Sequence, residues 1–321
     1  RFTSFSKAKS EWEQLTSSNS PFQSWWYLET FARHFSNSQD IYLLGAYRGK
    51  NLLAVGVFEV FEGKVVFLGM KPVLGGEEVT DFGDILTANT SLKTVKAVWQ
   101  AFLVYFKACG FSTIQLDYLP SKSPTYDLFS QEILFQVEVV KQETSPFITL
   151  PSTWDDYLAS LSHKRRKELK RKLHRLEEKR YALQVLDDIS QADFDDFVRL
   201  HRLSDPRKKQ FMSKKMADFF WDMGKAEKRY WQTKLAFLLI ENKRSAALFY
   251  FKSKEEVLLY NSGYDPQFSY YSVGLLLSAL LLKESIEKGR KRYDFLRGNE
   301  RYKYDLGADD AFLWQARIVL N

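Results

Sequence analysis

The sequence predicts an α/β protein with mixed, mostly antiparallel sheets flanked by helices, and three observations support this prediction. The 321 residues are 45% hydrophobic and 27% charged, which is typical of a folded chain of about two domains. Short strand-like runs are joined by turns rich in Gly and Asn, which favours antiparallel hairpins. The same order of elements occurs twice along the chain, which indicates two units of similar structure.

The first half is predicted to contain a helix, three strands, a second helix and a fourth strand. The expected helices cover residues 24–35 and 92–108, and the expected strands cover 41–47, 52–61, 64–69 and 113–117. Cys109, at the end of the second helix, is interpreted as a core residue. Asp81 and Asp84 precede this helix and either shape a turn, the interpretation we favour, or form an acceptor-binding wall.

The second half repeats this order after an aromatic-rich helical region. The expected strands cover residues 234–241, 245–251, 256–264 and 292–296, and the expected helix covers 272–288 and ends at Gly289. We therefore divide the chain into a first unit of residues 1–149 and a second unit of residues 150–321. Because the two halves share few identical residues, a chance similarity of element order is the alternative.

A strongly basic helix is predicted over residues 162–180. From position 164 onwards this segment holds ten Lys and Arg residues against three Glu, whereas the rest of the chain is balanced in charge. The helical pattern begins earlier, at a cap formed by Ser152 or Thr153, and it is interrupted near Ser162.

The basic helix would attract phosphate groups, and Lys164, Arg165 and Arg166 are its candidate anion-binding residues. A tRNA or an anionic membrane surface is a possible partner on this interpretation. The alternative is a solvated surface helix, which is what most charge runs are. Like charges on adjacent turns cost stability, however, and nothing nearby in the sequence offsets all of them.

Several classes of protein are excluded or disfavoured. The longest nearly unbroken apolar run, residues 273–282, is shorter than the roughly 20 residues of a membrane-spanning helix. The single Cys and the lack of a charged-then-apolar leader at Arg1 favour a reducing compartment, so we expect a cytoplasmic protein. The four His residues have no metal-site spacing, and no metal is expected. Nucleotide-binding loops and the serine-hydrolase motif are also lacking.

Four stretches of the sequence resemble one family. They are residues 22–35, ITLPSTWDDYLASLSHKRRKELKRKLHR at 148–175, YNSGYDP at 260–266 and YDFLRGNERYKYDLG at 293–307. These stretches resemble the GNAT-superfamily acyltransferases of the CelD-like group, which is linked to cellulose biosynthesis and is related to the FemABX peptidyltransferases. The resemblance implies tandem GNAT-like units, with the donor site in the second unit and a degenerate first unit on the acceptor side.

The candidate donor site opens the helix at residue 272. In GNAT enzymes this turn carries Arg or Gln, two residues, Gly, one residue, and Gly or Ala. Here the three positions hold Tyr271, Gly274 and Leu276, so only the central Gly matches. A helix N-terminus binds phosphate through its free N–H groups, which makes Ser272, Val273 and Gly274 candidate donor-binding residues. The alternative is that Ser272 is only a cap and Gly274 only a packing residue.

A second constellation follows the last predicted strand. The resemblance implies that Lys303, in a Tyr-Lys-x-x-Leu-Gly word, contacts anionic groups of the substrate or donor. Arg297 could hold a phosphate or carboxylate, and Glu300 or Asp294 could accept the amine proton if its pKa is raised. The alternative is a salt bridge from Asp294 or Glu300 to Arg297 that braces the loop. Tyr264 either donates a proton to the leaving group or fills the core.

These residues together predict an N-acyltransferase. The acyl group would move from acyl-CoA, or another activated donor, to an amine of a sugar, a peptide or a cell-envelope precursor by direct attack. A second hypothesis keeps the fold but uses aminoacyl-tRNA as the donor, as in the FemABX enzymes. A third hypothesis is a non-enzymatic binding module for nucleic acid or an anionic polymer.

Overall fold

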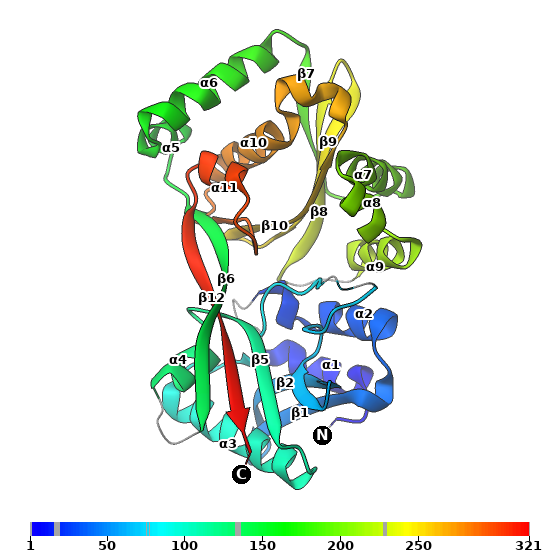
Figure 1. The fold of residues 1–321 in the computed structure, drawn as a ribbon, viewed down its shortest axis with the longest axis vertical. Helices are drawn as coiled ribbons and strands as arrows, with labels where there is room; N and C mark the ends of the chain where they lie inside the picture. Colours follow the sequence, from blue (N-terminus) through cyan, green and yellow to red (C-terminus); the bar gives the residue numbers. More distant parts are fainter. Residues whose placement is uncertain are drawn as a thin grey trace. The chain divides into compact units, whose positions relative to one another are not determined.

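The computed structural model describes residues 2–15, 20–74, 76, 78–131, 136–226 and 230–320 and divides into two compact units (Figure 1). Unit 1 comprises residues 1–144 and 311–321, and unit 2 comprises residues 145–310. Each unit combines a mixed sheet with flanking helices, so the predicted α/β class is confirmed. None of the described helices is both long enough and apolar enough to cross a membrane.

Unit 1 is a sheet covered by the long helix α3. Its helices are α1 (Phe5–Trp12), α2 (Trp25–Phe35), α3 (Leu92–Ala108) and α4 (Pro124–Gln131), with 3-10 turns at Glu13–Leu15, Pro21–Gln23 and Ser38–Asp40. Its strands are β1 (Ile41–Arg48), β2 (Asn51–Phe61), β3 (Lys64–Phe67), β4 (Leu86–Thr87) and β5 (Thr113–Pro120), with parts of β6 (Val137–Thr149) and β12 (Asp309–Val319). The aromatic rings of Trp99, Phe102 and Phe106 on α3 pack against Phe58 of β2.

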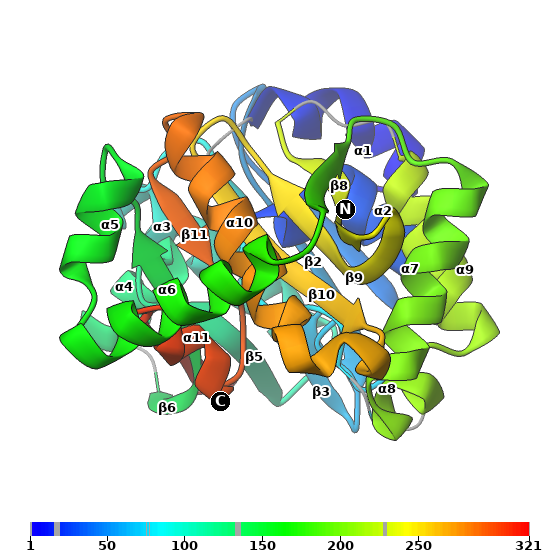
Figure 2. The same ribbon diagram turned by 90° about the horizontal axis from the view of Figure 1, so that it is seen from above.

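Unit 2 has helices on both faces of its sheet (Figures 1 and 2). Its helices are α5 (Trp154–Ser160), α6 (His163–Glu177), α7 (Gln191–Ser204), α8 (Pro206–Phe211), α9 (Lys214–Lys225), α10 (Val273–Glu287) and α11 (Arg301–Asp305), with a 3-10 helix at Pro266–Tyr271. Its strands are β7 (Tyr181–Leu186), β8 (Gln232–Ile240), β9 (Lys243–Lys252), β10 (Glu256–Tyr264) and β11 (Arg292–Asp294). Phe249 of β9 meets rings of α7 and α9, whereas its neighbours Leu248 and Tyr250 belong to the core beside α10.

The two units repeat one arrangement of strands. In unit 1, β1, β2 and β3 are antiparallel, α3 follows, and β5 pairs in parallel with β3. In unit 2, β8, β9 and β10 are antiparallel, α10 follows, and β11 pairs in parallel with β10. The predicted repetition of element order is therefore confirmed at the level of strand pairing.

The last strand lies in a different unit from the one we predicted. We assigned residues 311–321 to the second half, but Leu313 to Val319 pair antiparallel with β5 in unit 1. The buried carboxylate of Asp117 on β5 reinforces this pairing, because it accepts a hydrogen bond of 2.6 Å from Gln315 of β12. A strand partner about two hundred residues away in sequence has no local signal, so the prediction was wrong.

Helix α10 carries apolar residues around most of its circumference, and most of these residues are buried. It lies between the sheet of unit 2 and the pair α5 and α6, whose residues Tyr157, Leu161 and Leu169 join the same core. A helix that is apolar all round is typically buried in this way. The predicted break before α6 is also confirmed, since Ser162 caps α6 after a turn at Leu161. Cys109, which we expected in the core, is exposed.

Gly263 allows α7 to approach β10 closely. A Cβ atom at this position would lie 2.3 Å from both the Cα and the backbone N of His201 on α7. This contact fixes one face of the strand that leads to the candidate site.

Replacing Gly263 by Ala should destabilise the protein, because the new methyl group would overlap the α7 backbone. Overpacking of this kind costs about 1–3 kcal/mol, measured as the free energy of unfolding in urea. Gly224→Ala is the control, since the nearest atom to its methyl group would be 3.6 Å away and Ala favours helix α9. Equal stability of Gly263→Ala and wild type would contradict the close approach.

Candidate functional site

Strands β10 and β11 separate soon after they begin. They pair in parallel only from Glu256 to Leu258 on β10 and from Arg292 to Asp294 on β11. Strand β10 continues to Tyr264, and within the described residues it has no strand partner on this side beyond Leu258. In open α/β sheets, ligands bind at the carboxyl ends of neighbouring strands, so the candidate site lies where these strands diverge.

The turn that opens α10 carries the predicted donor-binding residues. Ser272 has left-handed backbone angles (φ 53°), and its hydroxyl does not cap the helix but accepts a hydrogen bond of 2.7 Å from Lys172 Nζ. The ring of Tyr264 lies against Gly274, because a Cβ atom there would be 3.5 Å from Tyr264 Cδ1. Ser272, Val273, Gly274 and Tyr264 are thus brought together, with the free N–H groups of the first helical turn beside them.

The basic helix α6 lies beside this turn. Arg175 donates a hydrogen bond of 2.8 Å to the Tyr270 carbonyl, and its guanidinium lies 4.4 Å from the centre of the Tyr270 ring. Lys172 is also 3.4 Å from the carboxylate of Glu168. Two cations of α6 are therefore fixed at the donor turn, about one hundred residues before it in sequence.

The three predicted anion-binding residues lie at the start of α6. Lys164 and Arg165 are exposed and have no ion pair in the part of the chain that the structure describes. Arg166 donates one long hydrogen bond, 3.4 Å, to the Ala159 carbonyl. Glu168 compensates part of the helix, since Arg171 lies 2.7 Å from it and lowers its pKa. Most of the positive charge of α6 remains uncompensated.

Asp294 is buried and fully engaged. Its Oδ2 lies 2.8 Å from Arg292, and its Oδ1 accepts hydrogen bonds from Ser145 (3.1 Å) and from the Leu296 N–H (2.8 Å). Among the described residues the ion-pair partner of Asp294 is Arg292 rather than Arg297, so the bracing contact exists with a different Arg. This carboxylate holds the start of the loop after β11.

Lys303 is directed into its own loop. Its side chain is only 2% exposed, and Nζ donates to the carbonyls of Leu296 (3.1 Å), Arg297 (2.7 Å) and Gly298 (3.0 Å). It also lies 2.9 Å from Glu300 Oε2. Leu296 and Gly298 have positive φ angles, which turn these carbonyls towards one point. The ammonium expected to contact the substrate is thus occupied by the loop.

Glu300 and Lys208 lie near one another at the end of β10. Burial lowers the pKa of Lys208, and the charge of Glu300, whose side chain is 59% exposed, offsets part of that effect. Lys208, on α8, donates a hydrogen bond of 2.6 Å to the Ser262 carbonyl of β10. Lys208 was not predicted as a site residue, because nothing in its local sequence indicates this partner.

His201 is a buried neutral group behind β10. Its side chain is 1% exposed, and Nε2 lies 2.7 Å from Asn261 Oδ1. Burial, with a smaller effect of Lys208, lowers the His201 pKa to about 3. The imidazole is therefore uncharged at neutral pH and packs α7 against β10.

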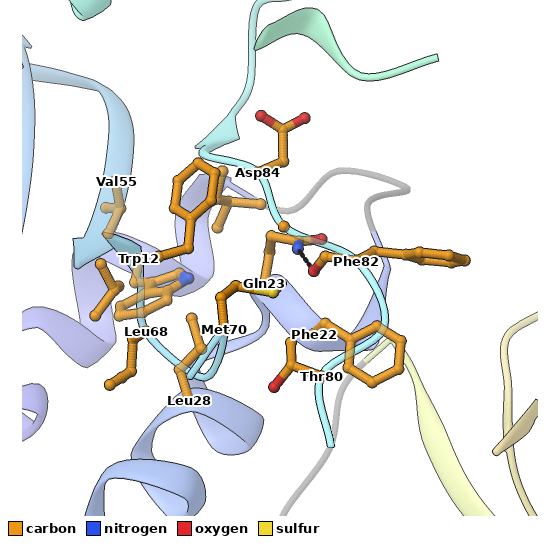
Figure 3. A pocket seen from close by; sticks show the side chains of 14 residues that line it. Trp12, Phe22, Gln23, Leu28, Val55, Leu68, Met70, Thr80, Phe82 and Asp84 are labelled. Carbon is orange, nitrogen blue, oxygen red and sulfur yellow. Dashed lines mark hydrogen bonds between the residues drawn. The ribbon is translucent and has the colours of Figure 1, made fainter. Parts of the chain in front are cut away.

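Unit 1 contains a small pocket beside Asp84 (Figure 3). Its volume is about 10 Å³, which is room for a single water. Asp84 accepts hydrogen bonds from Thr125 and from the Ile85 N–H, and burial raises its pKa to about 6. These contacts agree with the turn-shaping interpretation of Asp84. No group of three His, Cys, Asp or Glu within the described ranges could hold a metal ion.

Residues 163–304 match the family model described as an acetyltransferase (GNAT) domain. This segment contains α6, the donor turn and the loop of Lys303. The match supports a GNAT-type domain in this segment, which lies within unit 2, in agreement with the superfamily that the resemblance named. No curated protein matches the chain in sequence.

Solved structures with the same fold cover almost the whole chain. The C-terminal domain of a candidate lysylphosphatidylglycerol synthetase from Agrobacterium fabrum is 11% identical, with 99% of this chain and 92% of that chain covered and a TM-score of 0.61. FemX is 10% identical, with 100% and 97% covered and a TM-score of 0.61. L-PGS from Bacillus licheniformis is 13% identical, with 92% and 91% covered and a TM-score of 0.57. At these identities the likeness concerns the fold, and the CelD-like assignment stays a prediction.

Replacing Lys303 by Met should loosen the loop of residues 296–300, because three carbonyls lose their shared donor. The expected loss in free energy of unfolding is about 1–3 kcal/mol, with faster amide exchange in the loop. The control is Lys254→Met, an exposed Lys that makes no contact of this kind in the described chain. An unchanged rate of amide hydrogen exchange in the loop would contradict the contact between Lys303 and these carbonyls.

Replacing Asp84 by Asn should remove a pH dependence of stability. Because the folded pKa of about 6 lies above the ordinary value of 3.8, ionising Asp84 costs free energy. The cost is absent below pH 4, grows between pH 4 and 6, and reaches at most about 3 kcal/mol above that range. Urea unfolding of both proteins at pH 5 and 7.5 measures the difference, and equal pH dependence would exclude Asp84 as the source.

Proposed function

We propose that unit 2 transfers an acyl group from a phosphate-bearing activated donor to an amine. The observation that carries this proposal is the contact of Lys172 and Arg175 with the turn that opens α10. It supports an anionic donor, because it adds positive charge to a helix N-terminus beside the diverging strands. The match of residues 163–304 to the GNAT domain supports the reaction class.

The donor we propose is acyl-CoA, with its phosphates at the first turn of α10. The N–H groups of Val273 and Gly274 would donate to the phosphate oxygens, and Lys172 would turn from Ser272 to the same oxygens. Arg297, at the edge of the loop after β11, is a further candidate ligand. Tyr271 stands where GNAT enzymes carry Arg or Gln, and it has no positive charge. Lys172 would then supply a positive charge at this turn.

The proposed reaction is direct attack of the amine on the thioester carbonyl. The new C–N bond forms as the C–S bond breaks, so no covalent enzyme intermediate is needed. Glu300, the exposed carboxylate of the loop, would accept the amine proton, and Tyr264 would protonate the leaving thiolate. Asp294 and Lys303 would act as positioning residues, since they hold the loop that carries Glu300.

The acceptor we propose is an amine of a sugar, a peptide or a cell-envelope precursor. This choice follows the resemblance to the CelD-like and FemABX groups, and the fold shared with FemX is consistent with it.

The second candidate is an aminoacyl-tRNA donor. It is favoured by the exposed, unpaired cations Lys164 and Arg165, which share a helix with Lys172. Seven residues of helix span about 10 Å, so one strand of phosphates could follow α6 to the donor turn.

Lys172→Met should weaken binding of acetyl-CoA or a long-chain acyl-CoA at least tenfold in calorimetric titration, because the donor phosphates lose one charged ligand. Lys170→Met is the matched control on the same helix, since Lys170 is exposed and unpaired in the described chain. Its effect should stay below twofold.

The same titration with deacylated tRNA at low and moderate salt tests the second candidate. Binding of tRNA alone, falling steeply with salt and weakened by both Lys variants, would support an aminoacyl-tRNA donor. If a tRNA-binding chain then transfers no amino acid, the non-enzymatic binding module is favoured. Failure of every donor to bind would contradict the proposed transferase.

Glu300→Gln should lower kcat by about 10²–10⁴ with little change in donor affinity, because the amine loses its proton acceptor. A variant with wild-type kcat would exclude Glu300 as the base.

A further inference from the structure

A cluster of cations lies at the other end of α10 from the donor turn. It consists of Lys234 on β8, Lys252 at the end of β9, and Lys288 and Arg290, which flank the residue Gly289 that ends the helix. We call these four residues the cationic cluster. None of them belongs to the site described above.

Strand register brings two of these residues together. Lys234 pairs with Tyr250, and Lys252 is two residues further along β9, on the same face as Tyr250. That face is the one that α10 covers, since Tyr250 shares a core with Ile286. Diagonal neighbours on one face lie about 7–8 Å apart, which is within reach of long side chains.

Only part of the cluster is neutralised. Lys234 Nζ donates to the Asp187 carbonyl (2.8 Å) and lies 3.1 Å from its carboxylate. Arg290 Nη1 lies 3.3 Å from Glu284. Four cations therefore face two acids. Asp187 feels Lys234, Lys252 and Lys288 at once, and its pKa is lowered by them.

Three donors of this region remain unused. The Arg290 side chain is 10% exposed, and its buried Nε has no hydrogen-bond partner in the described chain. Lys252 is half-buried, its ammonium has no partner there either, and its pKa is lowered by burial and by the charges of Lys234 and Arg290. The Tyr250 hydroxyl likewise makes no hydrogen bond among the described residues. Of the three, Arg290 Nε is a buried donor without an acceptor, which is costly, and a bound ion is one common explanation.

We propose that the cationic cluster binds a small oxyanion, a phosphate or a carboxylate group, through Lys252, Arg290 and the Tyr250 hydroxyl. An oxyanion accepts several charge-assisted hydrogen bonds at once, so it would satisfy the three free donors and reduce the repulsion among the cations. Lys234 and Lys288 would add charge without direct contact. The site is independent of the proposed donor turn, because the two lie at opposite ends of α10.

The test is calorimetric titration of the full chain with sodium phosphate, and separately with sodium acetate, at constant ionic strength set by chloride. Phosphate should bind wild type, and Lys252→Met should weaken that binding at least tenfold. Lys254→Met is the matched control two residues away, exposed and unpaired in the described chain, and should change affinity less than twofold. Acetate binding with the same Lys252 dependence would identify a carboxylate rather than a phosphate site.

Two further variants keep the outcome decisive. Phosphate is also titrated into Lys172→Met, which removes the charged phosphate ligand proposed for the donor turn; binding that persists there and depends on Lys252 belongs to the cationic cluster, whether or not the proposed transferase activity is found. Lys252→Gln replaces Lys252→Met if the latter does not fold. Phosphate binding that is insensitive to Lys252, or no binding of either anion above the chloride background, would overturn the proposal.

Discussion

The early end of pairing between β10 and β11 is the constraint on which the rest of unit 2 depends. After Leu258 and Asp294 the two strands no longer share hydrogen bonds, so β10 keeps a free edge up to Tyr264. The backbone N–H and C=O groups along a free edge need hydrogen-bond partners, which can be other protein groups or a bound ligand. Lys208 takes one carbonyl of this edge, at Ser262. The loop after β11 turns away from β10, and buried polar contacts hold it in that conformation.

Those contacts give the charged residues of the loop different tasks. Asp294 and Lys303 are buried and bind backbone groups of the loop itself, which suits positioning. Glu300 is exposed beside them, which suits an encounter with substrate. A buried charge is retained only when it is paired and hydrogen-bonded, and both buried residues meet that condition. Burial thus distinguishes Asp294 and Lys303, which support the loop, from Glu300, which lies between them in sequence and is accessible to a substrate.

Helix α10 connects the two anion sites inferred in unit 2. Its first turn lies beside Lys172 and Arg175, and its last turn lies beside the cationic cluster. Its middle is largely enclosed by the sheet and by α5 and α6, where it makes polar contacts such as that from the Tyr293 hydroxyl to the Ser278 carbonyl. The fold therefore places positive charge at both ends of an almost wholly apolar helix.

The sequence by itself determined the elements with strong local patterns: the hairpins of β1 to β3 and β8 to β10, the helices α3 and α10, and the break that separates α5 from α6. It also predicted the GNAT-type domain, through short words such as that around Lys303. Periodicity and turn residues act over a few positions, and they therefore survive in sequence alone. Only the tertiary structure decided that β12 joins unit 1, that Lys303 is buried, and that Lys172 and Lys208 meet Ser272 and Ser262. The β12 pairing and the two Lys contacts join residues about 50 to 200 positions apart. The partners of Lys303 are close in sequence, but its burial depends on a loop conformation that its neighbours in sequence do not specify.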